Sequence, residues 1–228
     1  MLFFHFVLAL LLPIQSIGAD SSPGSSQSMV IEKTSIPDPK VGDTCVYRRV
    51  DYGRREHQYS ESVVHVTPGY SYRVTVTGPQ GVIGWQVYSR DGARWFKQIE
   101  RFVPRFEYPL HSRKQWDTRY EVPKGSRGKI TNYLTTLVEK VEIQELSIGG
   151  VNRPIRIVEI GVSGYYEEYN PASDAGDRGM GRIKEKIVYA PDIHCIVHRS
   201  FASTRWDNQS PSESMTLDLI EYRPALGR

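Results

Sequence analysis

The chain has 228 residues, of which 29 are Lys or Arg and 26 are Asp or Glu, and its formal net charge is +3. This length fits one domain that can bury a core without cross-links. Its N-terminal apolar run is shorter than the roughly 20 residues that a membrane-crossing helix needs, so we predict no transmembrane span.

Residues 1–19 have the layout of a secretory signal peptide. An almost wholly apolar run from Leu2 to Leu12 is followed by Pro13 and by a segment that ends in Gly18-Ala19. A short apolar region before a small-residue cleavage site directs export. We therefore expect an exported protein, either periplasmic or secreted.

The rest of the chain is predicted to be a flexible linker at 20–39, which is rich in Ser, Pro and Gly, and a single domain at 40–225. Charge is uneven within this domain. Residues 40–130 hold 17 Lys and Arg against 9 Asp and Glu, whereas residues 131–228 hold 11 against 14. A basic half on an exported protein favours a lipid, glycan or other anionic amphiphile as partner, and nucleic acid is not expected there. The alternative is that Arg-rich strands present a solvated face.

Alternation of apolar and polar residues predicts β-strands along most of the domain. It is clearest at 70–77, where Tyr72 and Val74 share one face. Asp91-Gly92 predicts a hairpin turn. The expected strands are 43–51, 58–67, 70–77, 82–90, 93–99, 115–122, 154–166, 183–189, 194–204 and 214–220.

The secondary structure of two segments is not obvious from their pattern. Residues 133–143 have helical spacing of Leu and Val, but Thr135-Thr136 and the alternation of Val141 with Ile143 favour a strand. Residues 168–182 are polar and contain three glycines, which predicts a long loop, and their composition favours disorder. The predicted fold is therefore mainly β, a single antiparallel curved sheet or half-barrel of about ten strands.

Cys45 and Cys195 are the two cysteines, and both lie in predicted strands near opposite ends of the domain. An even number of cysteines in an oxidising compartment permits a disulfide. The alternative is two small buried side chains that never meet.

The most distinctive local composition is the aromatic-basic stretch, residues 85–116. Aromatic faces flanked by guanidinium groups hold sugars, lipid head groups or other anionic amphiphiles. The alternative is that the rings fill the interior while the arginines reach outward. The residues that we expect to line a ligand site are Trp85, Trp95, Phe96, Phe106 and Trp116, with Arg94 and Arg101 for an anion.

No motif predicts a catalytic residue, a metal site or a cofactor. His194 and His198 are four residues apart, which on a strand separates them by about 13 Å, too far for one metal ion. Phosphate-loop, dinucleotide and zinc spacings are missing from the sequence.

Two segments resemble a family of exported β-rich bacterial proteins of unknown activity. Residues 41–51, VGDTCVYRRVD, are similar to its GDTWxYRxxD opening, and residues 189–199, YAPDIHCIVHR, to its YxPxxGxxVxR hairpin. Cys45 stands where that family usually has Trp, and His194 where it usually has Gly. The resemblance implies fold and location but no reaction. A looser analogy in fold is the LolA-like open half-barrel of lipoprotein carriers.

The leading interpretation is a non-enzymatic envelope protein that binds a hydrophobic or anionic amphiphilic ligand in a β half-barrel. The alternatives are an interaction or assembly module that pairs a strand edge with an envelope protein, and an envelope glycan hydrolase with two carboxylates about 5 to 10 Å apart.

Overall fold

The structure is a computed structural model that describes residues 29–53, 55–124, 128–148, 150–170, 177–206 and 211–225. The predicted signal peptide at 1–19 and the first part of the predicted linker, residues 20–28, lie outside the described residues.

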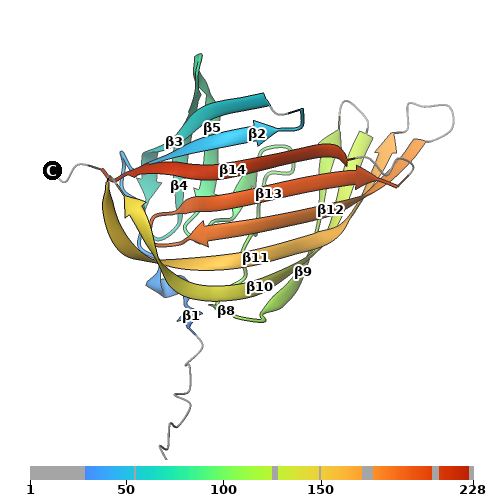
Figure 1. The fold of residues 1–228 in the computed structure, drawn as a ribbon. Helices are drawn as coiled ribbons and strands as arrows, with labels where there is room; N and C mark the ends of the chain where they lie inside the picture. Colours follow the sequence, from blue (N-terminus) through green and yellow to red (C-terminus); the bar gives the residue numbers. More distant parts are fainter. Residues whose placement is uncertain are drawn as a thin grey trace, which may run out of the picture.

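Nearly all the described chain is β-structure, which confirms the predicted fold class (Figure 1). β1 (Val30–Ile31) pairs with β8 (Leu110–His111), and η1 (Lys33–Ser35) is a single 3₁₀ turn. In the described residues a main sheet is formed by twelve strands: β2 (Thr44–Asp51), β3 (Arg55–Thr67), β4 (Ser71–Gly78), β5 (Gly81–Ser89), β6 (Arg94–Phe96), β7 (Arg101–Val103), β9 (Gln115–Lys124), β10 (Gly128–Ile148), β11 (Val151–Asn170), β12 (Asp177–Ala190), β13 (Cys195–Arg205) and β14 (Pro211–Arg223).

The main sheet consists of two antiparallel meanders that meet at one strand pair. Strands β2 to β7 follow one another on one side, β9 to β14 follow one another on the other, and β2 pairs with β14 between them. The sheet curls until its two ends approach each other: the rings of Phe96 on β6, next to edge strand β7, and Tyr120 on edge strand β9 have centroids 6.0 Å apart. The result is a nearly closed barrel (Figure 1).

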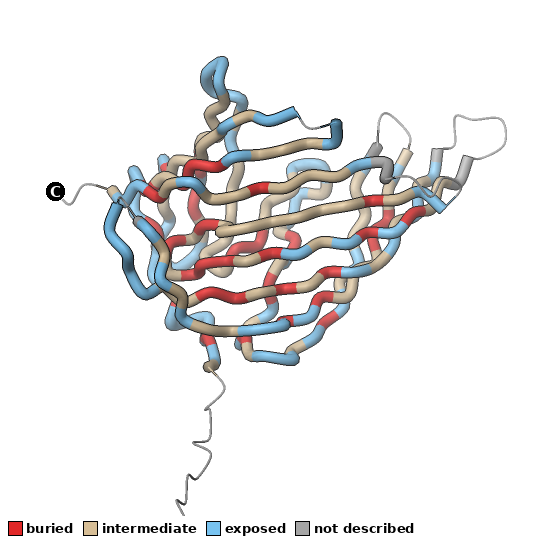
Figure 2. Tube along the Cα trace, viewed as in Figure 1, coloured by how far each residue is buried: buried red, intermediate tan, exposed pale blue. Residues whose placement is uncertain are grey.

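Alternation along the strands decides which side chains fill this barrel. On β11 the inward residues Val158, Ile160 and Val162 are buried, and Ile187 and Tyr189 of β12 pack in the same cluster. Buried positions recur along the strands of the sheet (Figure 2). The segment 133–143 lies within β10, which confirms the strand interpretation over the helical one.

Residues 29–40 form a strap that packs against the domain, so the flexible linker predicted at 20–39 is wrong for its second half. Ile31 and Ile36 are fully buried beside Leu110, which outweighs the Ser- and Pro-rich composition. The Arg90 guanidinium donates to the Ile36 carbonyl, at 3.1 Å from Nε, and Arg156 Nη2 donates to the Ser35 carbonyl at 3.0 Å. The strap is therefore held by apolar burial and by hydrogen bonds to its backbone.

The loop and disorder predicted at 168–182 are wrong for the described residues of that segment. β11 continues to Asn170 and β12 begins at Asp177, and the two strands stay paired to these ends. Gly181 lies opposite Tyr166, and a Cβ at this glycine would be 2.5 Å from the Tyr166 ring. The glycine therefore makes room for a cross-strand ring and does not mark a loop. Residues 171–176 lie outside the described residues.

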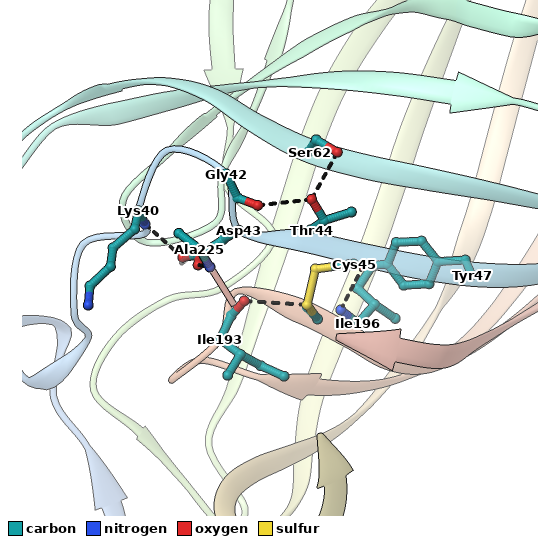
Figure 3. The surroundings of a disulfide bond; sticks show 11 residues. Lys40, Gly42, Asp43, Thr44, Cys45, Tyr47, Ser62, Ile193, Ile196 and Ala225 are labelled. Atoms are coloured by element: carbon teal, nitrogen blue, oxygen red, sulfur yellow. Dashed lines mark hydrogen bonds between the residues drawn. A yellow bond between two sulfur atoms is a disulfide. The ribbon is translucent and has the colours of Figure 1, made fainter. Parts of the chain in front are cut away.

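A disulfide joins Cys45 of β2 to Cys195 of β13 (Figure 3). Both residues are buried, and their Cα atoms are 6.0 Å apart. Beside it, the Ile196 backbone N–H donates to the Tyr47 hydroxyl at 3.3 Å. Because β2 belongs to the first meander and β13 to the second, the bond connects the two meanders across a sequence separation of 150.

Replacing both cysteines, Cys45→Ala with Cys195→Ala, is expected to lower the free energy of unfolding by about 5 kcal/mol, the chain-entropy value for a loop of this length. Urea unfolding followed by circular dichroism measures the change. Full reduction should lower the wild-type midpoint and leave the alanine variant unchanged. A wild-type midpoint that does not respond to reduction would contradict the prediction.

Candidate ligand-binding cavity

A cavity of about 230 Å³ lies on the inner side of the main sheet. Strands β2 to β6 form one wall, and residues of β12, β13 and β14 contribute to the other. It combines charged, phenolic and aliphatic side chains. The lining residues are Asp43, Cys45, Tyr47, Arg49, Tyr59, Glu61, Val63, Tyr72, Val74, Gln86, Tyr88, Gly92, Arg94, Arg105, Phe106, Tyr189, Ile193, His194, Ile196, Arg199, Met215 and Leu217.

Cross-strand register brings the phenol rings together in pairs. Tyr47 is opposite Tyr59, and their ring centroids are 5.2 Å apart. Tyr72 is opposite Tyr88, and these rings are stacked at 5.5 Å. Such pairs stabilise an antiparallel sheet and also give the cavity flat aromatic walls.

Burial raises the pKa of Tyr47, Tyr59, Tyr72 and Tyr88, so these phenols keep their protons at neutral pH. A protonated phenol has one O–H donor and can also accept. The Tyr88 hydroxyl lies 2.5 Å from Oε1 of Gln86. The aromatic walls are therefore neutral surfaces with polar tips.

The opposite wall is built on Gly92 and a pair of stacked rings. Phe106 and Tyr189 have centroids 4.4 Å apart. Gly92 has φ 80°, and a Cβ there would be 2.8 Å from the Phe106 ring. Only glycine satisfies both the left-handed turn and this close approach. The Tyr189 hydroxyl is buried and has no hydrogen-bond partner among the described residues.

Two of the four cavity arginines are neutralised by neighbouring carboxylates. Arg199 forms an ion pair with Glu185, and Arg49 Nε lies 2.7 Å from Asp51 Oδ1. These pairs hold their guanidinium groups in place, so the remaining positive charge of the cavity comes from other residues.

Arg94 and Arg105 are the two remaining arginines, and neither forms an ion pair with a carboxylate of the described residues. The Arg94 guanidinium lies 5.2 Å from the centre of the Phe96 ring. Burial lowers the pKa of Arg105, but the charges of Glu185 and Glu61 and the phenol of Tyr88 outweigh that effect and raise it. A guanidinium group has N–H donors and no acceptor, so both side chains can donate hydrogen bonds to an anion.

Glu61 is the carboxylate that faces these arginines from β3. Burial raises its pKa, and the charges of Arg105, Arg94 and Arg199 only partly oppose this effect. The carboxyl group is therefore more easily protonated than an exposed one, and the cavity becomes more positive as it takes up a proton.

His194 closes the cavity beside the strap. Its Nε2 lies 2.7 Å from the Pro37 carbonyl, and its ring packs edge-on against Tyr72 at 5.3 Å. Burial lowers its pKa, which favours the neutral ring. His198 instead pairs with Asp218 at 2.8 Å. Among the described residues, no group of three or more His, Cys, Asp and Glu side chains is placed to hold a metal ion.

The residues expected from the aromatic-basic stretch are divided by the structure. Arg94 and Phe106 line the cavity. Trp116 is buried in the apolar core, and Phe96 packs against Tyr120. Trp95 packs against Phe102, and Trp85 and Arg101 are exposed. None of these last five residues lines the cavity.

Most of the cavity residues could not be selected from the sequence. Tyr47, Glu61 and Arg199 come from three strands, and only the sheet register brings them to one side. The available signal was the alternation at 70–77, which placed Tyr72 and Val74 on one face. Extending that alternation across the paired strands would have marked Tyr88 as well.

No protein-family model matches the chain, and no curated protein matches it in sequence. Among solved structures, a protein from Parabacteroides distasonis described as a "putative lipoprotein" is similar, with a TM-score of 0.45 and 13% identity. The match covers 82% of this chain and 97% of that chain. Within the described residues, no helix is long and apolar enough to span a membrane.

Glu61→Gln is expected to stabilise the protein at pH 8. Because the folded carboxyl has a raised pKa, its ionisation destabilises the fold as pH rises through that value. The gain should disappear near pH 4, below the ordinary value of 4.5, where the carboxyl is protonated in both states. Thermal unfolding between pH 4 and 8 measures the effect.

Glu56→Gln is the matched control, because Glu56 is an exposed carboxylate on the same strand. It should change the midpoint little at any pH. A destabilised Glu61→Gln protein at pH 8 would instead mean that this carboxylate is needed to balance Arg94 and Arg105.

Proposed function

We propose that this is an exported protein that binds a small anionic ligand with an aromatic or aliphatic part inside the barrel. The carrying observation is that Arg94 and Arg105 line the cavity and that, among the described residues, neither forms a direct ion pair with a carboxylate, although the charges of Glu61 and Glu185 act on Arg105. Charged groups inside a protein are normally paired, since an isolated charge is costly to remove from water. A bound anion would supply the partner.

The remaining lining supports a ligand with a nonpolar part. Val63, Val74 and Leu217 contribute aliphatic surface, and the stacked pair Tyr72 and Tyr88 contributes an aromatic face. Ligand sites commonly combine such apolar walls with a few oriented polar groups. The ligand's anionic group would lie at the two arginines, and its body would lie along the tyrosines.

The cavity volume limits the ligand. About 230 Å³ is below the roughly 300–1,000 Å³ of sites for drug-sized molecules. This space accommodates a small aromatic acid or one end of a larger amphiphile. A bulky glycan chain does not fit inside it, so the glycan remains a weaker candidate than a small acid.

Export is supported by two independent features. The Cys45–Cys195 disulfide belongs to an oxidising compartment, and residues 1–19 have the layout of a signal peptide. These features support a proposed binding activity in the envelope or outside the cell, where a binding protein would meet small acids or amphiphiles.

Isothermal titration with phenyl phosphate and benzoate tests the proposal, with benzyl alcohol as the neutral probe. We expect the two anions to bind and the alcohol to bind at least tenfold more weakly. Arg105→Gln and Arg94→Gln should each weaken anion binding by about 10- to 100-fold, the range for losing one charged hydrogen bond.

Arg101→Gln is the matched control, since Arg101 is an exposed arginine outside the cavity. Its affinity should equal that of the wild type. Equal binding of benzyl alcohol and benzoate, or an equal loss in all three variants, would overturn the proposal. Native mass spectrometry of the purified protein gives a second readout, in which a retained acid is expected.

A further inference from the structure

The β4–β5 hairpin projects beyond the body of the barrel (Figure 1), and its tip, where apolar residues lie, is exposed (Figure 2). Val82 is 71% exposed, Ile83 is 69% exposed and Trp85 is 59% exposed. Residues this apolar are usually buried, and a group of them at one projecting tip commonly marks an interaction site.

The hairpin is also separated from the neighbouring strand. β6 pairs with β5 only at Tyr88 and Arg94, so residues 81–87 form an open edge. The two strands are joined at Gly78 and Gly81, and their tip includes the exposed Pro79 and Gln80. The tip can therefore approach a surface without movement of the barrel.

A second aromatic group lies on the same outer side of the sheet. Gln86, Tyr88 and Arg94 line the cavity, so alternation directs Trp85 and Trp95 to the outer side. Trp95 contacts Phe102 at 5.2 Å between centroids, and Phe102 contacts the exposed Tyr70 at 6.2 Å.

Three exposed cations accompany these rings. Arg73 lies between the inward residues Tyr72 and Val74, so it points outward, and Lys97 and Arg101 belong to the β6–β7 hairpin. Among the described residues, none of the three cations forms an ion pair with a carboxylate. Their charges are therefore available to an external anionic surface.

We propose that this outer surface, formed by the β4–β5 tip, the Tyr70–Trp95–Phe102 rings and the three cations, docks on an anionic lipid bilayer. Trp and Tyr rings favour the membrane interface, and nearby Lys and Arg are attracted to anionic head groups. Val82 and Ile83 lie next to the turn of the hairpin, and Arg73, which is paired with Val87, lies farther from the turn. This arrangement would place the tip among the acyl chains and the cations at the phosphates.

Vesicle co-sedimentation with the full mature protein tests this proposal. We expect binding to vesicles of phosphatidylglycerol and phosphatidylcholine, and at least tenfold weaker binding to phosphatidylcholine alone. Raising the salt from 0.05 to about 0.5 M should weaken the binding, because it screens the attraction of the cations. Trp85 should also show a blue-shifted emission component that Trp85→Phe removes.

Ile83→Ser with Trp85→Ser should weaken vesicle binding at least tenfold while unfolding midpoints stay unchanged, since both side chains are exposed. The matched control is Ile143→Ser with Val151→Ser, which removes apolar groups that are 56% and 55% exposed on another hairpin. This control should bind vesicles as the wild type does.

Equal binding to both vesicle types, no binding by folded protein, or an equal loss in the control would overturn the proposal. So would an envelope protein that captures the tip while vesicles do not. Arg105→Gln separates this site from the cavity, because it should weaken benzoate binding and leave vesicle binding unchanged. Failure of one proposal is therefore distinguishable from failure of the other.

Discussion

The inner face of the main sheet carries apolar and aromatic side chains from both meanders, and apart from the single turn of η1 the described residues contain no helix that could cover it. The sheet must therefore cover itself by curling. Fully burying side chains such as Ile160 and Ile187 contributes about 1.5–3 kcal/mol each. The strap adds Ile31 and Ile36 to the same buried cluster as Ile160 and Ile187. Closure, the strap and the cavity all follow from this need.

The charged groups of the cavity interrupt that apolar interior. Arg199 and Arg49 form ion pairs with Glu185 and Asp51, whereas Arg94 and Arg105 form no direct ion pair with a carboxylate of the described residues. Replacing a buried ion pair by well-packed apolar residues is often neutral or stabilising, so fold stability alone does not require such a cluster. Ionisable groups arranged in this way are more typical of sites that bind or react.

The sequence predicted strands better than it predicted their partners. Alternation located most strands and placed Tyr72 and Val74 on one face, but it does not identify which distant strands pair with each other, such as β2 with β14. The placement of Glu61 on the same cavity as Arg94 and Arg105 depends on such a register, so composition could not select it. Gly181 was misinterpreted because a glycine that makes room for Tyr166 looks the same as a loop glycine in the sequence. His194 has φ 55°, in the left-handed region that glycine adopts without strain, so the glycine of the similar family would fit the same backbone.

The aromatic-basic stretch is explained by its division between two surfaces. From Trp85 onward, alternate residues face opposite sides of the sheet, so Tyr88 and Arg94 reach the cavity while Trp85 and Trp95 face outward. Because the adjacent strands β5 and β6 supply both the inward and the outward residues, aromatic and basic residues are concentrated over a short length of sequence. A single interior site would need them only at every second position. Their presence on both faces therefore reflects two separate surfaces, the wall of the cavity and the outer side of the sheet, for which we propose a small anion and an anionic bilayer.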